Sequence, residues 1–433
     1  PGKMFGPALD DGFDVVIGNP PYVQIQKFKA SDKAAWVEQK FKTYTASADI
    51  YCLFYERGVR LLKDGGHLSY ITSNKWMRAG YGEALRQYLA KDVETQSVMD
   101  FGMAQNFGAA TTYTCIVQLA KRPASGVTRG CYVADDKTAM TNPRDYFESN
   151  AVPLIGLGAS PWVILTPERY RIKVEVERQG LPLEKWQIAI YRGILTGYND
   201  AFYIGTEDRN KFIAEDSRCA ELIVPLLRGR YVDKFATQWE KAEDEKWMIN
   251  SHNGVKELGI PPVNLRDDYP VLWNHLVAHE EKLTTRLDKG DHWSNLRNCA
   301  YINDFQKVKI IYPEITKRLG FFLDKGNGFY PNNKAFILTS EAESLPYLTA
   351  VLNSMLFRCC FRDNFPELMG NTYEVRKIFM DKIPIKKPTA QQAALFEALV
   401  PMVQAAKAES QKADCSELKS VASFLEEVID ACV

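Results

Sequence analysis

Short apolar runs alternate with amphipathic stretches over the first 120 residues. An apolar run predicts a short buried strand at 13–17, and further strands are predicted at 67–73, 95–101 and 112–119. Apolar positions spaced three and four apart predict helices at about 47–63 and 78–91. Strands that alternate with helices of this length are typical of α/β folds. Residues 1–122 are therefore predicted to form the second half of a doubly wound sheet.

The rest of the chain divides into three further parts. Proline and glycine break the pattern in 123–186, which is predicted to be a connector with one helical stretch near 167–178. A mixed α/β module is expected over 187–388. Two apolar stripes in 389–433, separated near 409–415, predict a helical hairpin packed on that module. A partner-binding coiled coil is the alternative, although each stripe is short for a heptad seam.

Composition narrows the class of protein. The chain has 433 residues with 54 basic and 54 acidic side chains, so any nucleic-acid surface must come from local arrangement. The nine cysteines form no C-x-x-C pair, which indicates the reducing cytoplasm without disulfides or a metal site. No apolar run reaches membrane-spanning length. Because the chain enters a mid-sheet strand soon after Pro1, we expect it to be a fragment of a longer protein.

Candidate chemistry follows the first strand, at Asn19, Pro20, Pro21 and Tyr22. The Asn19 side-chain oxygen and the Pro20 carbonyl are two acceptors on a rigid turn without competing N–H groups. Two such acceptors suit an amino group on an aromatic ring. By accepting both of its hydrogens, they free the nitrogen lone pair for attack on an electrophile. The Tyr22 ring offers a flat face for stacking.

This stretch resembles motif IV of the S-adenosylmethionine-dependent amino-group DNA methyltransferases, and asparagine in first place points to adenine-N6. Residues 48–66, 70–76 and 106–117 resemble motifs V, VI and VIII of that family in the same order. The resemblance implies the C-terminal half of a Rossmann-like methyltransferase sheet. It also implies that Phe107 stacks on a flipped-out target base opposite Tyr22, as base-flipping enzymes require. A core aromatic is the alternative for Phe107.

The family's cofactor-binding half has no counterpart here. We find neither a glycine-rich loop opening a helix nor an acidic ribose ligand, so the S-adenosylmethionine pocket is expected to be mostly absent, with Asn19 at its edge. Mg²⁺ is expected only if the parent protein also carries a nuclease domain. No metal site is expected in this chain. His275 and His279 have the spacing of metal ligands, but no cysteine lies near them in the sequence to complete a site.

The module over 187–388 resembles the target-recognition domain of Type IIG restriction-modification enzymes, which are prokaryotic and bind double-stranded DNA. Its basic and amide side chains can contact phosphates or base edges. The candidate DNA-binding residues are Arg192, Thr196, Asn199, Arg228, Arg230, Lys317, Arg318, Asn332 and Asn333.

Several functions stay open on sequence alone. The first is a site-specific adenine-N6 DNA methyltransferase with its specificity domain. The second is a DNA-binding specificity module that is inactive alone because the cofactor half is missing. A methyltransferase of a non-restriction phage-defence system, or one acting on protein glutamine or RNA, is the third. The recognition sequence and the oligomeric state are not encoded in any motif.

Overall fold

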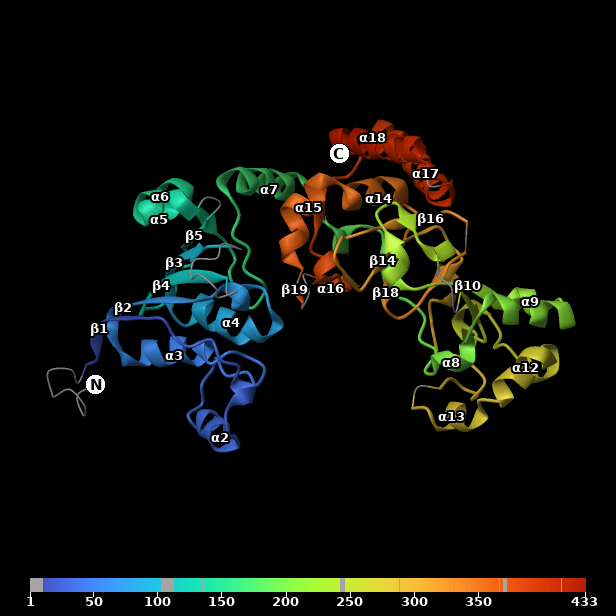
Figure 1. Cartoon of the computed structure of the whole chain (residues 1–433), viewed down its shortest axis with the longest axis horizontal. Helices are drawn as coiled ribbons and strands as arrows, with labels where there is room; N and C mark the ends of the chain where they lie inside the picture. The colour runs from blue at the N-terminus through green and yellow to red at the C-terminus, as the bar shows by residue number, and fades with distance from the viewer. Residues whose placement is uncertain are drawn as a thin grey trace. The chain divides into compact units, whose positions relative to one another are not determined.

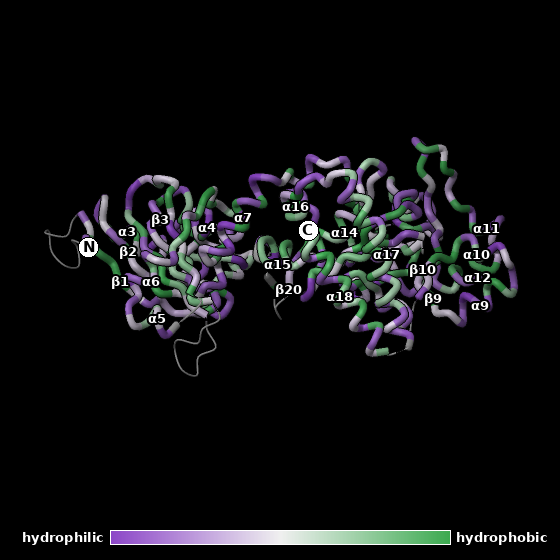
Figure 2. The backbone as a smooth tube through the Cα atoms, turned by 90° about the horizontal axis from the view of Figure 1, so that it is seen from above, coloured by the Kyte–Doolittle hydropathy of each residue, from purple (hydrophilic) through white to green (hydrophobic). Residues whose placement is uncertain are grey.

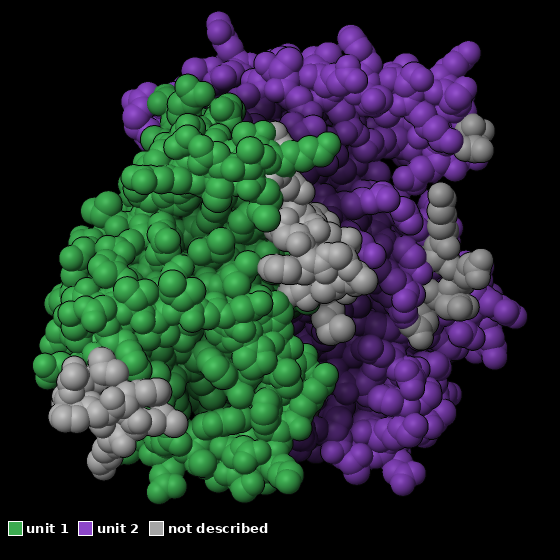
Figure 3. Space-filling view, turned by 60° about the vertical axis from the view of Figure 1, so that its left-hand side comes forward, with its two compact units in different colours: residues 1–175, 363–369 green, residues 176–362, 370–433 purple. Residues whose placement is uncertain are grey.

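The computed structural model describes residues 11–102, 113–133, 136–241, 246–287, 289–326, 328–365, 367–368, 372–413 and 415–433. Contacts divide the chain into two compact units, coloured separately in Figure 3. Unit 1 contains Pro1–Glu175 and Asp363–Met369, and unit 2 contains Val176–Arg362 and Gly370–Val433. Each unit is described by itself.

A six-stranded sheet in the order β1-β2-β4-β3-β5-β6 forms the centre of unit 1. β1 runs parallel to β2, and β3 runs parallel to β5, whereas β4 is antiparallel to both of its neighbours. The strands are β1 (Phe13–Gly18), β2 (Leu62–Ser73), β3 (Glu94–Asp100), β4 (Thr114–Ala120), β5 (Thr128–Tyr132) and β6 (Val152–Leu154). This mixed α/β sheet confirms the predicted fold class.

Helices cover both faces of that sheet (Figure 1). The helices α3 (Tyr51–Leu61) and α4 (Glu83–Lys91) bury their apolar sides in one cluster with the inward residues of β2, β3 and β4. The opposite face packs against α5 (Asp136–Thr141) and α6 (Pro143–Asn150). Alternation along β3 explains the division, because Val98 belongs to the first cluster and Met99 to the second.

The first strand differs from its prediction. Residues 13–17 were expected to be buried, but β1 is an edge strand in which Val15 is 54% and Ile17 is 78% exposed. Val16 packs against the cluster under α3, so its two neighbours must face the other side of the sheet, where no described element covers them. In Figure 2, which colours the backbone by hydropathy, β1 is a hydrophobic segment near the N-terminus.

Part of the expected connector belongs to the sheet. β5 and β6 lie within 123–186 and extend the strand order beyond β3. Trp162 packs on Trp76 with ring centroids 5.2 Å apart, and its backbone N–H donates to the Met77 carbonyl. The prediction missed these strands because they are only five and three residues long, β5 carries polar residues and β6 contains a proline. The predicted helix is present as α7 (Pro167–Gln179).

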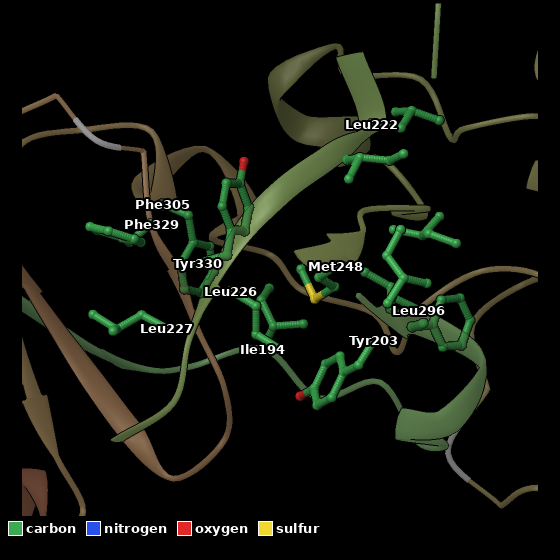
Figure 4. Packing of buried hydrophobic residues seen from close by; sticks show 14 of the residues in the cluster. Ile194, Tyr203, Leu222, Leu226, Leu227, Met248, Leu296, Phe305, Phe329 and Tyr330 are labelled. Carbon is green, nitrogen blue, oxygen red and sulfur yellow. The ribbon is translucent and has the colours of Figure 1, made fainter. Parts of the chain in front are cut away.

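Unit 2 contains two four-stranded sheets, in the orders β17-β10-β13-β9 and β16-β14-β18-β8. Side chains from both sheets meet in one hydrophobic cluster, shown close up in Figure 4. The strands of these sheets are β8 (Ala189–Arg192), β9 (Tyr203–Ile204), β10 (Ile223–Leu227), β13 (Trp247–Ile249), β14 (Lys309–Pro313), β16 (Phe322–Asp324), β17 (Tyr330–Pro331) and β18 (Ala335–Thr339). Short ladders add β7 (Leu181–Pro182) with β21 (Pro384–Ile385), β11 (Val232–Asp233) with β12 (Ala236–Thr237), and β15 (Ile315–Thr316) with β20 (Thr372–Glu374).

Helices complete unit 2. Every residue of α14 (Leu345–Asn353) is buried, and α17 (Ala390–Ala413) packs against it and against α18 (Ser416–Cys432). The helical hairpin predicted for 389–433 is confirmed. The remaining helices are α8 (Asn199–Phe202), α9 (Thr206–Glu215), α10 (Cys219–Leu222), α11 (Leu265–Asp268), α12 (Pro270–Val277), α13 (Glu280–Thr285), α15 (Met355–Phe361) and α16 (Lys377–Met380).

Candidate functional site

The Asn19–Tyr22 turn lies at the carboxyl end of β1. Because β1 and β2 are parallel, with Gly18 opposite Tyr70, the ends of both strands meet at one edge of the sheet. Open α/β sheets bind ligands outside this edge. Asn19 is exposed there and Pro20 is buried. The turn therefore presents one polar side chain on a fixed backbone.

Two contacts fix the ring of Tyr22. Its hydroxyl donates to the Ile71 carbonyl on β2 at 3.4 Å. Its ring meets that of Tyr51 edge-on, with centroids 6.0 Å apart and planes at 85°. Burial raises the pKa of the Tyr22 hydroxyl, so the side chain is neutral. The side chain is part-buried and packs against the core cluster of unit 1.

Backbone hydrogen bonds tie the turn to the start of α3. The N–H of Ile50 donates to the Val23 carbonyl, and that of Ile25 donates to the Ala48 carbonyl, both at 2.8 Å. Because the Ala48 carbonyl and the Ile50 N–H bond to the turn, they do not form helical hydrogen bonds. The helix predicted from about residue 47 therefore begins at Tyr51. They also bring the motif-V-like segment beside the motif-IV-like turn.

The sequence reasoning missed a polar network next to this turn. The Tyr81 hydroxyl donates to Asp49 Oδ2 at 3.4 Å and lies 2.8 Å from the Tyr51 hydroxyl. Burial raises the pKa of Asp49, while Lys75 and Lys27 oppose the shift. An aspartate immediately before an apolar helix start was the available signal. The network supports the same Tyr51 ring that contacts Tyr22.

Asn74 directly follows β2 and joins three segments through hydrogen bonds. Its side-chain amide donates to Asp100 Oδ1 at 2.8 Å and to the Gly102 carbonyl at 3.1 Å. Its backbone N–H donates to the Tyr113 carbonyl at 3.0 Å. Gly102 and Tyr113 flank the segment that contains Phe107, which lies outside the described residues. The role of Phe107 therefore stays a prediction.

In unit 2 the structure brings three of the candidate DNA-binding residues together. Arg192, at the end of β8, forms an ion pair with Glu314 and donates through Nε to the Asn333 carbonyl at 3.0 Å. The Asn332 side-chain oxygen accepts from the N–H groups of Gly229 and Lys334, both at 3.3 Å. These side chains are only part-buried, so the cluster reaches the surface.

Two glycines allow the close packing of this cluster. A Cβ atom on Gly193 would lie 2.1 Å from the Asn332 carbonyl oxygen, and one on Gly229 would lie 2.3 Å from that of Lys334. At both positions the neighbour that excludes a Cβ atom is the chain's own backbone, so the packing of this cluster requires glycine there.

The other candidates lie in several places. Arg228 is half-buried over the Tyr203 ring, and Arg230 is exposed over Tyr231. Lys317 and Arg318 are exposed beyond β15. Asn199 is exposed at the first turn of α8, and the buried Thr196 hydroxyl donates to its side-chain oxygen at 2.7 Å. Thr196 thus orients Asn199 and offers little surface of its own.

Arg286 was not singled out from the sequence, although it organises the neighbouring loops. Its guanidinium donates to the carbonyls of Thr196, Trp293 and Asn295 and lies over the Phe202 ring. Burial lowers its pKa. An arginine that donates hydrogen bonds to three carbonyls in two loops holds these loops in a fixed position relative to each other.

Metal and membrane sites have no structural support within the part of the chain that is described. No cluster of three or more histidine, cysteine or acidic side chains in that part could hold a metal ion. His275 directs Nε2 to the Ala201 carbonyl at 3.0 Å. Among the described helices none is both long and apolar enough to cross a bilayer.

Comparisons with known proteins cover both units. Residues 3–107 match the Eco57I restriction-modification methylases, and residues 224–385 match the TaqI-like C-terminal specificity domains. The chain carries an Eco57I-type restriction-modification methylase domain and a TaqI-like specificity domain. The methylase domain contains the Asn19–Tyr22 turn, and the specificity domain contains the cluster around Arg192 and Asn332 only in part, since Arg192 precedes residue 224.

Similar proteins include Type II methyltransferases and restriction-modification enzymes. Type II methyltransferase M.XhoI of Xanthomonas vasicola is 25% identical over 90% of this chain and 72% of its own length. Type II restriction enzyme and methyltransferase RM.Eco57I of Escherichia coli is 30% identical over 35% of this chain and 15% of its own length. The solved Type IIL restriction-modification enzyme MmeI in complex with DNA has a TM-score of 0.51 at 14% identity, covering 96% of this chain and 54% of MmeI. The chain therefore spans about half of that enzyme.

Proposed function

We propose that this chain is part of a Type II restriction-modification protein that methylates adenine-N6 in double-stranded DNA. The methylase domain takes the target adenine, and the specificity domain selects the sequence. Relatives named Type II methyltransferases support the reaction class. RM.Eco57I, which is named both restriction enzyme and methyltransferase, supports the view that a parent protein could also cleave DNA and would then require Mg²⁺.

The observation that carries the proposal is the fixed geometry of the Asn19–Tyr22 turn. Asn19 is exposed at the carboxyl edge of β1, and Tyr22 is held by the Ile71 carbonyl and the Tyr51 ring. A planar base can stack on a ring that is already oriented. An exocyclic amino group then lies within reach of an acceptor beside that ring.

The chemistry follows from these groups. The Asn19 side-chain oxygen and the Pro20 carbonyl accept the two amino hydrogens of adenine and direct the nitrogen lone pair outward. No strong base is needed to form the new bond, since the amino nitrogen is the nucleophile and its proton leaves afterwards. In the proposal Tyr22 and Phe107 hold the two faces of the base.

The residues present do not fit a complete S-adenosylmethionine pocket. When bound, this cofactor supplies an electrophilic methyl group. Among the described residues, no glycine-rich turn opens a helix next to β1, and the outer side of β1 carries exposed Val15 and Ile17. We propose that the cofactor is held mainly by residues that this sequence does not contain, with Asn19 at the edge of the pocket.

For DNA, we propose that the surface cluster of Arg192, Asn332 and Asn333, together with Arg228 and Arg230, faces the duplex. Asn199, Lys317 and Arg318 extend this basic surface in the proposal, and Thr196 acts through Asn199. Replacing Arg228 or Arg230 by alanine is expected to weaken binding and to lower its dependence on salt. Unchanged affinity and salt dependence in both variants would place them away from the interface.

The test of catalysis uses the full-length protein that contains this chain. Asn19→Ala is expected to abolish methyl transfer to DNA while leaving DNA affinity within about twofold, because only an acceptor at the reacting nitrogen is lost. Asn142→Ala is the matched control, since Asn142 caps α6 with its side chain and should not affect transfer. Undiminished methylation by Asn19→Ala would refute the assigned role.

One alternative has its own support. Because the outer side of β1 is exposed, the chain by itself could act only as a DNA-binding specificity module. Titration of the purified chain with S-adenosylmethionine separates the two readings, since only an active chain requires cofactor binding. Methylation of a protein or RNA but not of DNA would instead favour another methyltransferase class.

A further inference from the structure

The helix α2 (Ala30–Glu38) follows the Asn19–Tyr22 turn and packs on the core through one part-buried residue, Trp36, whose ring meets that of Phe28 with centroids 5.2 Å apart. None of its nine residues is buried, and Val37 is 57% exposed. Surface helices of globular proteins normally bury an apolar stripe. Figure 1 shows α2 beyond α3, away from the strands of the sheet. Apart from Trp36, the core of unit 1 does not account for this helix.

The segment that carries α2 is nevertheless firmly mounted. At its start, the short 3-10 helix Ile25–Lys27 has a fully buried Ile25. At its return, the buried carboxylate of Glu56 accepts from the backbone N–H and the hydroxyl of Thr43, at 3.0 and 3.1 Å. Arg60 pairs with Glu56 and donates to the carbonyls of Gln39 and Lys40. An exposed helix fixed at both ends is typical of a preorganised contact surface.

The charge of this segment is one-sided. Residues 27–42 contain five lysines and two acidic residues in a chain that is neutral overall. Lys27 and Lys29 are exposed. Lys75, also exposed, follows the end of β2 in the short 3-10 helix Asn74–Met77. Lys27 ends the short 3-10 helix that follows the bridge between Gln24 and Asp49, and Lys75 follows the carboxyl end of β2, so both lysines lie near the edge that carries the Asn19–Tyr22 turn.

We infer that residues 27–42 and Lys75 form a phosphate-binding arm for the DNA backbone beside the target base. The inference rests on the proposed function. Duplex DNA is the occupant because it carries one phosphate charge per about 1.7 Å and must reach this edge to deliver a base to Tyr22. Flanking lysines neutralise the phosphates that approach each other when a nucleotide leaves the stack.

The test compares two variants that each lose two positive charges. Lys27→Ala/Lys75→Ala removes lysines at the carboxyl edge. Lys63→Ala/Lys121→Ala removes lysines near the other end of β2, where Lys63 pairs with Asp14 and Lys121 donates to the Leu62 carbonyl. Binding of a short labelled duplex is measured by fluorescence anisotropy over a range of salt concentrations, with circular dichroism to confirm folding.

The arm variant is expected to lower the slope of log Kd against log salt by about 1.8, since each phosphate contact contributes about 0.9. The control pair should leave the slope unchanged. In the full-length enzyme the arm variant should raise the KM for DNA and leave kcat unaltered. Equal slopes for the wild type and the arm variant, or equal losses in both variants, would overturn the inference. Failure of the proposed function is distinguishable, because the full-length wild-type protein would then transfer no methyl group to DNA even where the salt slopes differ as expected.

Discussion

The buried ion pair between Lys309 and Asp324 allows a quantitative prediction for the specificity domain. The two residues face each other across β14 and β16, and their side chains are 1% and 0% exposed. Lys309 Nζ donates to Asp324 Oδ2 at 2.8 Å and to the carbonyls of Phe305 and Lys307 at 2.6 and 3.3 Å. Burial lowers the pKa of Lys309, and the Asp324 charge opposes that shift.

Replacing Asp324 by asparagine keeps the shape and removes the compensating charge. The Lys309 ammonium would then be buried with carbonyl partners only, a situation that costs about 3–5 kcal/mol. For a unit of this size the transition temperature should fall by about 10 °C, since each kcal/mol shifts it by about 2–4 °C. Lys309→Met/Asp324→Leu removes both charges and should recover most of the loss, apart from the Phe329 N–H that donates to Asp324 Oδ2 at 2.9 Å.

Differential scanning calorimetry of the chain and hydrogen exchange of β14 and β16 would measure the effect. Asp64→Asn is a suitable control, because the Asp64 side chain is 96% exposed and pairs with Lys121 at 3.3 Å. If Asp324→Asn lost less than about 1 kcal/mol, the pair would behave like an exposed ion pair and the reasoning from burial would be refuted. Additive effects of the two single substitutions would also contradict it.

Three more predictions concern the remaining polar contacts. Asn74→Asp removes the amide donor to the buried Asp100 and should speed hydrogen exchange at the ends of β3 and β4 by about tenfold or more, whereas unchanged exchange would show that the tie is dispensable. Lys234 and Lys407 outweigh the burial of Glu426 and lower its pKa, so its contribution to stability is full above the unfolded value near 4.5 and is lost as pH falls through the folded value. Proteolysis within α18 should therefore accelerate as the pH falls below the unfolded value, and should not do so in Glu426→Gln. Burial raises the pKa of Cys115 to about 12, so this thiol should resist alkylation at pH 8 in the native protein, and rapid labelling there would contradict its burial.

Long amphipathic helices could be predicted well from the sequence. Contacts between residues far apart in the sequence could not. The break between α17 and α18 lies where the two apolar stripes end, because each stripe must face α14 or its partner helix. In contrast, α3 starts later than its pattern suggests, because Ile50 bonds to the Val23 carbonyl across the site. The exposure of β1 could not be predicted either, since an apolar run looks the same at the edge of a sheet and in its middle.

The candidate site followed the same rule. Asn19 and Tyr22 were recognisable because their spacing is local and their chemistry depends on neighbours in the chain. Asp49 and Tyr81 were missed because they lie 32 residues apart, and Arg286 because its contact with Thr196 spans 90 residues. Pairing of Arg192 with Glu314 likewise depends on the register of β8, β18 and β14, which no local pattern reveals.

The packing of Gly193 against Asn332 and of Gly229 against Lys334 bears on how this domain could acquire a new target sequence. Three loops from distant parts of the chain are joined there through backbone atoms, so an insertion in one loop would displace the other two. Exchanges of outward side chains such as Arg230 leave that joint intact. Divergence in sequence preference should therefore proceed by substitution at constant loop length, with both glycines retained.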